Sequence, residues 1–204
     1  MKKLLLLALL IVINSYTTTL VLAQNYTNPD TTSSIVLSWE KNHPERQAWS
    51  KSLISDLDSH LTIFDEAKDI TSFCPKYETL SHDQRLNMLG EMIVSVAHYE
   101  SDWIPSTASV DAGKKKDKDT WSVGLLQMSV IDQTTYNIKL GYTFTDLQDP
   151  IKNLHLGISI LSVLVKRYGY IANQPGGGSY WSTLRPDAEV HNIQFHTKSL
   201  SFCK

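Results

Sequence analysis

The chain has 204 residues, 42% of them apolar, and a formal net charge of −2. This length is typical of one domain, or of a small domain with an extension, and the apolar content is enough for a packed core. The near-neutral charge and the lack of a long basic tract argue against nucleic acid as a main partner.

The first segment, residues 1–23, has the features of a signal peptide: two basic residues, an apolar run, and small residues at its end. Its removal takes Lys2 and Lys3 and leaves 17 basic against 21 acidic side chains. A membrane anchor is the alternative, but it would place the polar stretch 14–19 in the bilayer. Gln24 follows the cleavage site instead of a cysteine, which disfavours a lipid anchor. We therefore expect a periplasmic or secreted protein without stable membrane insertion.

Residues 24–34 are polar and predict a flexible leader, so we place one globular domain at 35–204. A helix is predicted over 44–69, because large apolar side chains recur there at helical spacing. These residues are expected in the core: Trp49, Leu53, Leu57, Leu61 and Phe64. Residues 71–80 then read as a connection.

Export also bears on the two cysteines, Cys74 and Cys203, because an oxidising compartment allows them to pair. A bond between them would tie the end of the chain to the segment before the next helix. Two unpaired thiols are the alternative. Two cysteines alone make a poor metal site, and His98, His191 and His196 do not complete one, so we expect no metal.

The next helix begins at a capping box, in which Ser81 and Gln84 bond to each other's backbone amides. Apolar residues then share one helical face up to Glu100: Leu86, Leu89, Ile93, Val96 and Ala97. Partial burial and the negative end of the helix dipole would both raise the pKa of Glu100. Such a protonated glutamate can act as a general acid, whereas in the alternative it ends a surface turn and reaches water.

A charged loop over 105–121 follows, in which Asp111, Asp117 and Asp119 are candidates for a second carboxylate. A plain solvated loop is the alternative. At its end, Gly124 is expected to permit close backbone approach beneath Glu100.

A second long helix is predicted from Asp149 and Pro150 to Gly169, with a cap, a first-turn proline and a glycine stop. Apolar residues cover a wide part of its surface, which predicts a helix at the centre of the fold. Of the later aromatic residues, Tyr180 and Trp181 are candidates either for contact with a ligand or for the core.

Three motifs together resemble lytic transglycosylases and goose-type lysozymes. They are V-A-H-Y-E-S-D-W at 96–103, G-L-L-Q-M at 124–128, and D-P-x-x-N-x-x-x-G at 149–157. The resemblance implies an all-α, lysozyme-like fold in a single domain. It also implies cleavage of the β-1,4 bond between N-acetylmuramic acid and N-acetylglucosamine in peptidoglycan glycan strands, without a cofactor and by a monomer.

Within this resemblance, Glu100 is the catalytic residue, and the candidate substrate contacts are Ser101, Ser122, Gln127, Tyr180 and Trp181. The chain departs from the transglycosylase pattern twice. It lacks the A-Y-N-A-G motif, and Lys118 stands where those enzymes often have serine. Two alternatives therefore stay open: a hydrolytic lysozyme that uses a second carboxylate, and a non-catalytic glycan-binding module.

Overall fold

The computed structural model describes residues 35–110 and 117–204, so the expected signal peptide, the leader and Asp111 lie outside the described residues. The described helices belong to one unit, Thr32–Lys204. Its elements are η1 (Ser38–Glu40), η2 (Pro44–Arg46), α1 (Gln47–Asp65), α2 (Ile70–Phe73), η3 (Tyr77–Thr79), α3 (His82–Ser101), β1 (Ala108–Ser109), η4 (Lys118–Thr120), β2 (Ser122–Val123), α4 (Asp132–Thr135), η5 (Asp146–Gln148), α5 (Pro150–Tyr168), η6 (Gly177–Ser179), η7 (Ser182–Leu184), α6 (Val190–Ser199) and η8 (Ser201–Cys203).

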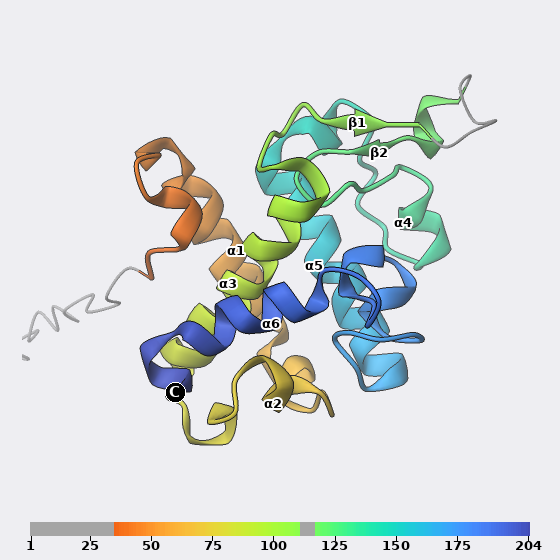
Figure 1. Ribbon diagram of the computed structural model, residues 1–204. Coiled ribbons are helices and arrows are strands. Elements are labelled where there is room, and N and C mark those ends of the chain that lie inside the picture. Colours follow the sequence, from red (N-terminus) through yellow and green to blue (C-terminus); the bar gives the residue numbers. More distant parts are fainter. Residues whose placement is uncertain (1–34, 111–116) are drawn as a thin grey trace, which may run out of the picture. The chain divides into compact units, whose positions relative to one another are not determined.

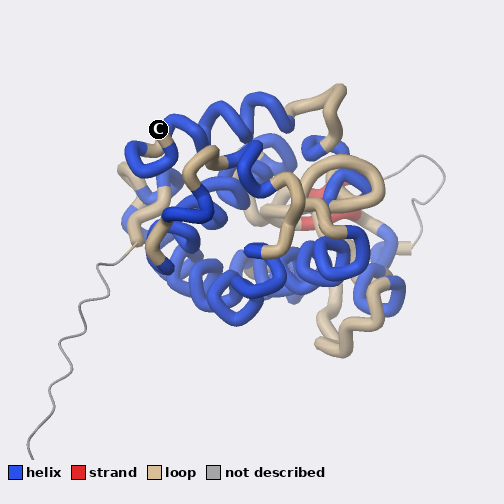
Figure 2. The backbone as a smooth tube through the Cα atoms, turned by 90° about the horizontal axis from the view of Figure 1, so that it is seen from below, coloured by secondary structure: helices blue, strands red, loops and turns tan. Residues whose placement is uncertain are grey.

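Helix packing makes the fold all-α, as expected. α1 lies against both α5 and α3, and α6 packs along α3 (Figure 1). The short antiparallel pair β1 and β2 lies among loops, with Ala108 opposite Val123 (Figure 2). Among the described helices, none is both long and apolar enough to cross a bilayer.

The predicted helix at 44–69 is shorter in the structure. A 3-10 turn precedes it, α1 ends at Asp65, and the chain then turns before α2. The reason is a tertiary contact: the Asp69 carboxylate accepts the backbone N–H groups of Ile171 and Ala172, both at 2.8 Å. This anchor needs a bend that a continuous helix would not allow. The predicted core residues of α1 are buried, except for the half-buried Trp49.

The two other predicted helices agree with the structure. Ser81 caps α3 through the expected capping box, in which the backbone N–H of Gln84 donates to Ser81 Oγ at 3.3 Å. The apolar stripe that leads to Glu100 is buried throughout. α5 begins at Pro150 with Asp149 as its cap and ends at Gly169, whose φ is 79°. Most of its apolar side chains are buried, as expected for a central helix.

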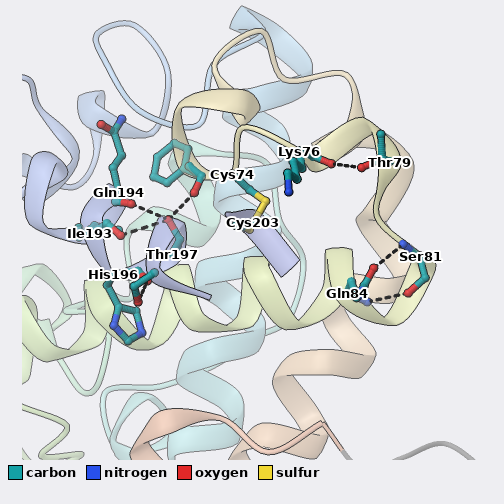
Figure 3. Close-up of a disulfide and its surroundings, with 12 residues drawn as sticks. Cys74, Lys76, Thr79, Ser81, Gln84, Ile193, Gln194, His196, Thr197 and Cys203 are labelled. Atoms are coloured by element: carbon teal, nitrogen blue, oxygen red, sulfur yellow. Dashed lines mark hydrogen bonds between the residues drawn. A yellow bond between two sulfur atoms is a disulfide. The ribbon is translucent and has the colours of Figure 1, made fainter. Parts of the chain in front are cut away.

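Cys74 and Cys203 form a disulfide bond, as the sequence predicted, and it joins segments 129 positions apart (Figure 3). α6 is held beside it by the Thr197 hydroxyl, which donates to the Phe73 carbonyl at 2.7 Å. The C-terminal end of the chain is therefore fixed to the segment around α2.

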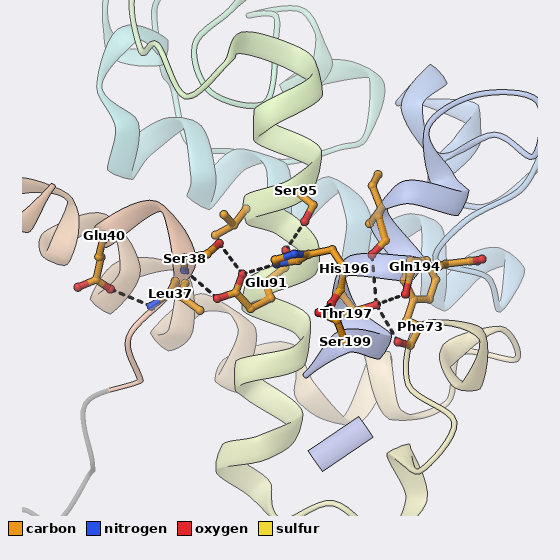
Figure 4. Close-up of polar contacts among 12 residues, drawn as sticks. Leu37, Ser38, Glu40, Phe73, Glu91, Ser95, Gln194, His196, Thr197 and Ser199 are labelled. Atoms are coloured by element: carbon orange, nitrogen blue, oxygen red, sulfur yellow. Dashed lines mark hydrogen bonds and ion pairs between the residues drawn. The ribbon is translucent and has the colours of Figure 1, made fainter. Parts of the chain in front are cut away.

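A buried carboxylate, Glu91, joins three segments near the middle of α3 (Figure 4). It accepts the backbone N–H and the hydroxyl of Ser38, each at 2.7 Å. His196 of α6 contacts its other side at 2.8 Å. The N-terminal turn and the C-terminal helix are thus both tied to the helix that carries Glu100.

Candidate active site

Glu100 lies in the last turn of α3 and is half-buried. The chain leaves the helix through Asp102 and Trp103, which both have left-handed backbone angles (φ 51° and 59°). This sharp exit leaves the Glu100 side chain at the edge of a groove. The position agrees with the prediction that an apolar helical face leads to a partly buried Glu100.

Two effects set the acidity of Glu100. Burial raises the pKa of its carboxyl above the ordinary value, because the charged form is deprived of water. The Thr183 hydroxyl donates to Oε1 at 2.9 Å, which favours the charged form and lowers the pKa by a smaller amount. The net shift is upward, so Glu100 is biased towards the protonated form that a general acid needs.

A groove of about 460 Å³ opens beside Glu100. Its walls come from the hairpin, from the start of α4 and from the segment before η7. The residues that line it are Glu100, Thr107, Ser109, Thr120, Ser122, Gln127, Ser129, Ile131, Asp132, Tyr180, Trp181 and Ser182. Four of the five predicted substrate contacts therefore meet in one groove with Glu100.

The fifth predicted contact, Ser101, lies elsewhere. It is buried, and its hydroxyl donates to the carbonyls of Ala97 (3.0 Å) and Leu125 (2.9 Å). One residue along a helix turns the side chain by about 100°, so Ser101 faces the interior while Glu100 faces the groove. In the structure Ser101 joins the end of α3 to the loop that contains Leu125.

The loop at 123–128 is held in place by α5. The Asn153 side chain accepts the Leu126 N–H at 2.8 Å and donates to the carbonyls of Val123 and Leu147. Gly124 has φ 78°, and a Cβ there would stand 2.3 Å from Asn153 Nδ2 and 2.4 Å from the Leu147 oxygen. The close approach predicted for Gly124 is therefore made to Asn153 and Leu147, not to Glu100.

Gln127 lines the groove, but its amide is already bonded within the hairpin. Nε2 donates to the carbonyls of Thr107 (3.2 Å) and Gly124 (2.9 Å), and Oε1 accepts the Ser109 hydroxyl at 2.9 Å. Gln127 thus braces the groove wall and also forms part of its surface.

The two aromatic candidates have different surroundings. Trp181 is only 3% exposed, and its indole N–H donates to the Leu126 carbonyl at 2.9 Å. It is mainly a core residue with one edge on the groove. The Tyr180 hydroxyl donates to the Asp132 carboxylate, and burial raises the pKa of this phenol well above its usual value.

The charged loop does not bring its described carboxylates to the groove. Asp117 caps η4 by accepting the Asp119 N–H at 3.1 Å, and neither residue is among those that line the groove. Lys118 places its ammonium 5.4 Å from the ring centre of Phe144. The second carboxylate that does line the groove is Asp132.

Sequence reasoning missed both Asp132 and Thr183. A signal for Asp132 was present in the pattern Ser129-x-x-Asp132, because the serine amide and hydroxyl both donate to that carboxylate. The chain gives no such signal for Thr183, which reaches Glu100 across 83 positions of sequence. In the part of the chain that the structure describes, no three His, Cys, Asp or Glu side chains gather into a metal-binding cluster.

Comparisons with known proteins identify the family of this chain. The family described as Transglycosylase SLT domain matches residues 80–181, which include Glu100, Gln127 and Tyr180. Solved structures of the protein DslA are similar to this chain, with 31% identity, a TM-score of 0.72, and coverage of 84% of this chain and 99% of DslA for the wild-type form.

Two glutamate-to-glutamine variants of DslA match equally well, both with a TM-score of 0.72 and with 31% and 32% identity over the same shares of the chains. Among curated protein sequences, none matches the chain. The family match spans half of the chain and the DslA match covers 84% of it, so the chain belongs to the transglycosylase SLT domain family, whose activity is of the lytic transglycosylase type on peptidoglycan.

Proposed function

We propose that the protein is a lytic transglycosylase that cleaves the β-1,4 bond between N-acetylmuramic acid and N-acetylglucosamine, with Glu100 as the sole acid and base. The observation that carries this proposal is the half-buried Glu100, with its raised pKa, at the edge of a groove large enough for sugar rings. The substrate contacts in this proposal are Ser122, Gln127, Tyr180 and Trp181, which line the same groove.

In the reaction, protonated Glu100 gives its proton to the glycosidic oxygen as the bond to C1 of the muramic acid breaks. The 6-hydroxyl oxygen of the same sugar then bonds to C1, and its proton passes to the Glu100 carboxylate. Glu100 is thereby protonated again. The products are a 1,6-anhydromuramyl end and a free 4-hydroxyl on N-acetylglucosamine.

A hydrolase is the second candidate, because Asp132 supplies a second carboxylate in the groove. In that reaction water takes the place of the 6-hydroxyl and leaves a reducing end. Either reaction requires a protein outside the cytoplasmic membrane, in keeping with the expected signal peptide. The disulfide is also typical of an oxidising compartment.

Mass spectrometry of the products separates the candidates. Peptidoglycan digested by the chain from residue 24 onward should yield anhydro ends. Reducing ends would establish the hydrolase instead. Binding of glycan strands without any cleavage would establish the non-catalytic module.

Glu100→Gln is the matched variant, because it keeps the size of the side chain and removes the transferable proton. The cleavage rate should fall by about 10²-fold or more. Glu66→Gln, an exposed glutamate beyond α1, is the control and should leave the rate unchanged. A Glu100→Gln protein that retains most of its rate would disprove the assignment of the acid.

A further inference from the structure

Asp132 is a buried carboxylate that the single-glutamate mechanism does not use. It is the first residue of α4 and is 9% exposed. Its Oδ2 accepts the Ser129 N–H at 2.7 Å, the Ser129 hydroxyl at 2.8 Å and the Tyr180 hydroxyl. A carboxylate that is buried away from water is unfavourable unless hydrogen-bond donors like these bind it. The three hydrogen bonds therefore hold Asp132 in one position in the groove wall.

The contact with Asp132 determines the direction in which the Tyr180 hydroxyl donates its proton. Burial, and then the neighbouring charge of Asp132, raise the pKa of Tyr180 well above its ordinary value, so the phenol keeps its proton. A phenol has only one proton, and here it points to Oδ2 of Asp132. The Gln127 carbonyl, at 3.4 Å, is the more distant acceptor. The Ser129 backbone N–H donates towards one lone pair of the Tyr180 oxygen, which lowers its pKa slightly, and the second lone pair remains for a hydrogen-bond donor in the groove.

Tyr180 also has a fixed place relative to the reacting bond. Three residues after it, Thr183 donates to Glu100 at 2.9 Å, so one short segment carries both contacts. Two neighbouring groups in the wall, the Gln127 amide and the Ser109 hydroxyl, are already bonded to each other and to the backbone. Tyr180 therefore offers an acceptor beside Glu100 to a sugar that presents a hydroxyl or an amide N–H.

We propose that Asp132 is a positioning residue: it holds the proton of the Tyr180 hydroxyl away from the groove, so that the phenolic oxygen accepts a hydrogen bond from a hydroxyl or N–H group of the bound glycan. The inference rests on the proposed function only in taking a glycan strand as the ligand. Asp132 acts through Tyr180 and does not itself touch the substrate.

A double-mutant cycle on glycan affinity tests this inference, with all variants made in the Glu100→Gln background so that no cleavage occurs. The probe is a purified peptidoglycan tetrasaccharide. Tyr180→Phe removes the accepting oxygen and should weaken binding about threefold to tenfold, which is the range for one hydrogen bond. Asp132→Ala should weaken binding by a similar factor, because the freed proton can turn into the groove.

The double variant decides between the mechanisms. If Asp132 acts through Tyr180, the double variant binds as weakly as Tyr180→Phe alone, because no hydroxyl remains to be oriented. Independent roles would multiply the two losses and would overturn the inference. Wild-type affinity of Asp132→Ala would overturn it as well.

Controls separate this role from a structural one. Tyr136→Phe is the matched control, since this ring stands 5.9 Å from that of Tyr180 and does not line the groove. It should leave affinity unchanged. Asp132→Asn is the conservative variant, because its side-chain oxygen can still accept from Ser129 and from the Tyr180 hydroxyl. It should keep nearly the full affinity, and a loss as large as that of Tyr180→Phe would overturn the inference even if Asp132→Ala does not fold.

The same variants with Glu100 restored separate the inference from the proposed function. Product analysis of the wild type and of Glu100→Gln tests the proposed function alone, whereas the binding cycle needs no catalysis. In the active enzyme, Tyr180→Phe should raise KM more than it lowers kcat. If Asp132 instead had a direct catalytic role, adding Asp132→Ala to the Tyr180→Phe variant would lower kcat further.

Discussion

The proton on Glu100 is governed by two opposing contacts, each from a different part of the chain. Burial against the end of α3 raises the pKa of the carboxyl, and the hydrogen bond from Thr183 lowers it by less. In the proposed reaction Glu100 acts as the acid only while it is protonated, so we expect cleavage to be lost as the pH rises through this pKa. Thr183 therefore sets how far the active range extends to high pH.

Thr183→Val tests this role at nearly constant shape. The variant removes the hydroxyl that favours the charged form of Glu100, so the pKa of Glu100 should rise further. The high-pH limb of the kcat profile should move to higher pH. Thr62→Val, on the exposed face of α1, is the matched control and should leave the profile in place. A limb that moves to lower pH, or not at all, would contradict the assigned role of Thr183.

Among the elements, α5 supports the groove more than it lines it. Asn153 makes three hydrogen bonds to backbone groups, two of them in the 123–128 loop and one at Leu147. Gly157 leaves space for Leu126, since a Cβ there would lie 2.3 Å from Leu126 Cδ1. Both residues belong to the motif on this helix. Their spacing of four places them on the same face, towards the loop.

Asn153→Leu should lower the free energy of unfolding by at least about 2 kcal/mol, because the buried Leu126 N–H loses its partner. Cleavage should fall as well, since the loop that carries Gln127 loses its support. Urea denaturation with linear extrapolation measures the first effect and product formation the second. The exposed Asn192→Leu is the control and should change stability by less than about 0.5 kcal/mol.

At the scale of the whole molecule, both ends of the described unit are tied to α3 or to the segment just before it. Glu91 holds Ser38 on one side and His196 on the other. The disulfide holds Cys203 beside α2 and the connection into α3. These links fix α3, and hence Glu100, relative to both ends of the described unit.

Replacing both Cys74 and Cys203 by serine should lower the free energy of unfolding by about 2–5 kcal/mol, since the bond closes a long loop of the unfolded chain. Denaturation with and without a reductant measures this. The reductant should destabilise the wild type and leave the double variant unchanged. Two free thiols in the oxidised, unfolded protein would contradict the pairing.

The contact between His196 and Glu91 predicts a dependence of stability on pH. The hydrogen bond to Glu91 raises the pKa of His196 above 6.5, the value for a free side chain, despite an opposing effect of burial. A raised pKa in the folded state means that the protonated histidine adds stability, fully below about pH 6.5 and progressively less as the pH rises through the folded-state pKa.

His196→Gln should therefore cost more stability at pH 5.5 than at pH 8.5, as measured by denaturation at both values. The exposed His191→Gln should show no such difference, because it lies one turn away on the same helix without a carboxylate contact in the described structure. Equal losses for His196→Gln at the two pH values would disprove the link.

Those elements of the protein that have local causes could be predicted from the amino-acid sequence. The spacing of apolar residues predicted α3 and α5, and the capping residues Ser81 and Asp149 predicted where they begin. Such signals depend on neighbours three or four positions apart, which the sequence displays directly. The same stripe placed Glu100 at the end of a buried helix, and the motifs brought Gln127 to the same groove.

Contacts between side chains of different elements could be found only from the way the helices and loops pack together. Asp132 meets Tyr180 across 48 positions, and Thr183 meets Glu100 across 83. These contacts depend on how the loops cross the end of α3, which no local periodicity encodes. The direction of Ser101 was also decided at this level, because the rotation of one residue about the helix axis turns its side chain into the core instead of the groove.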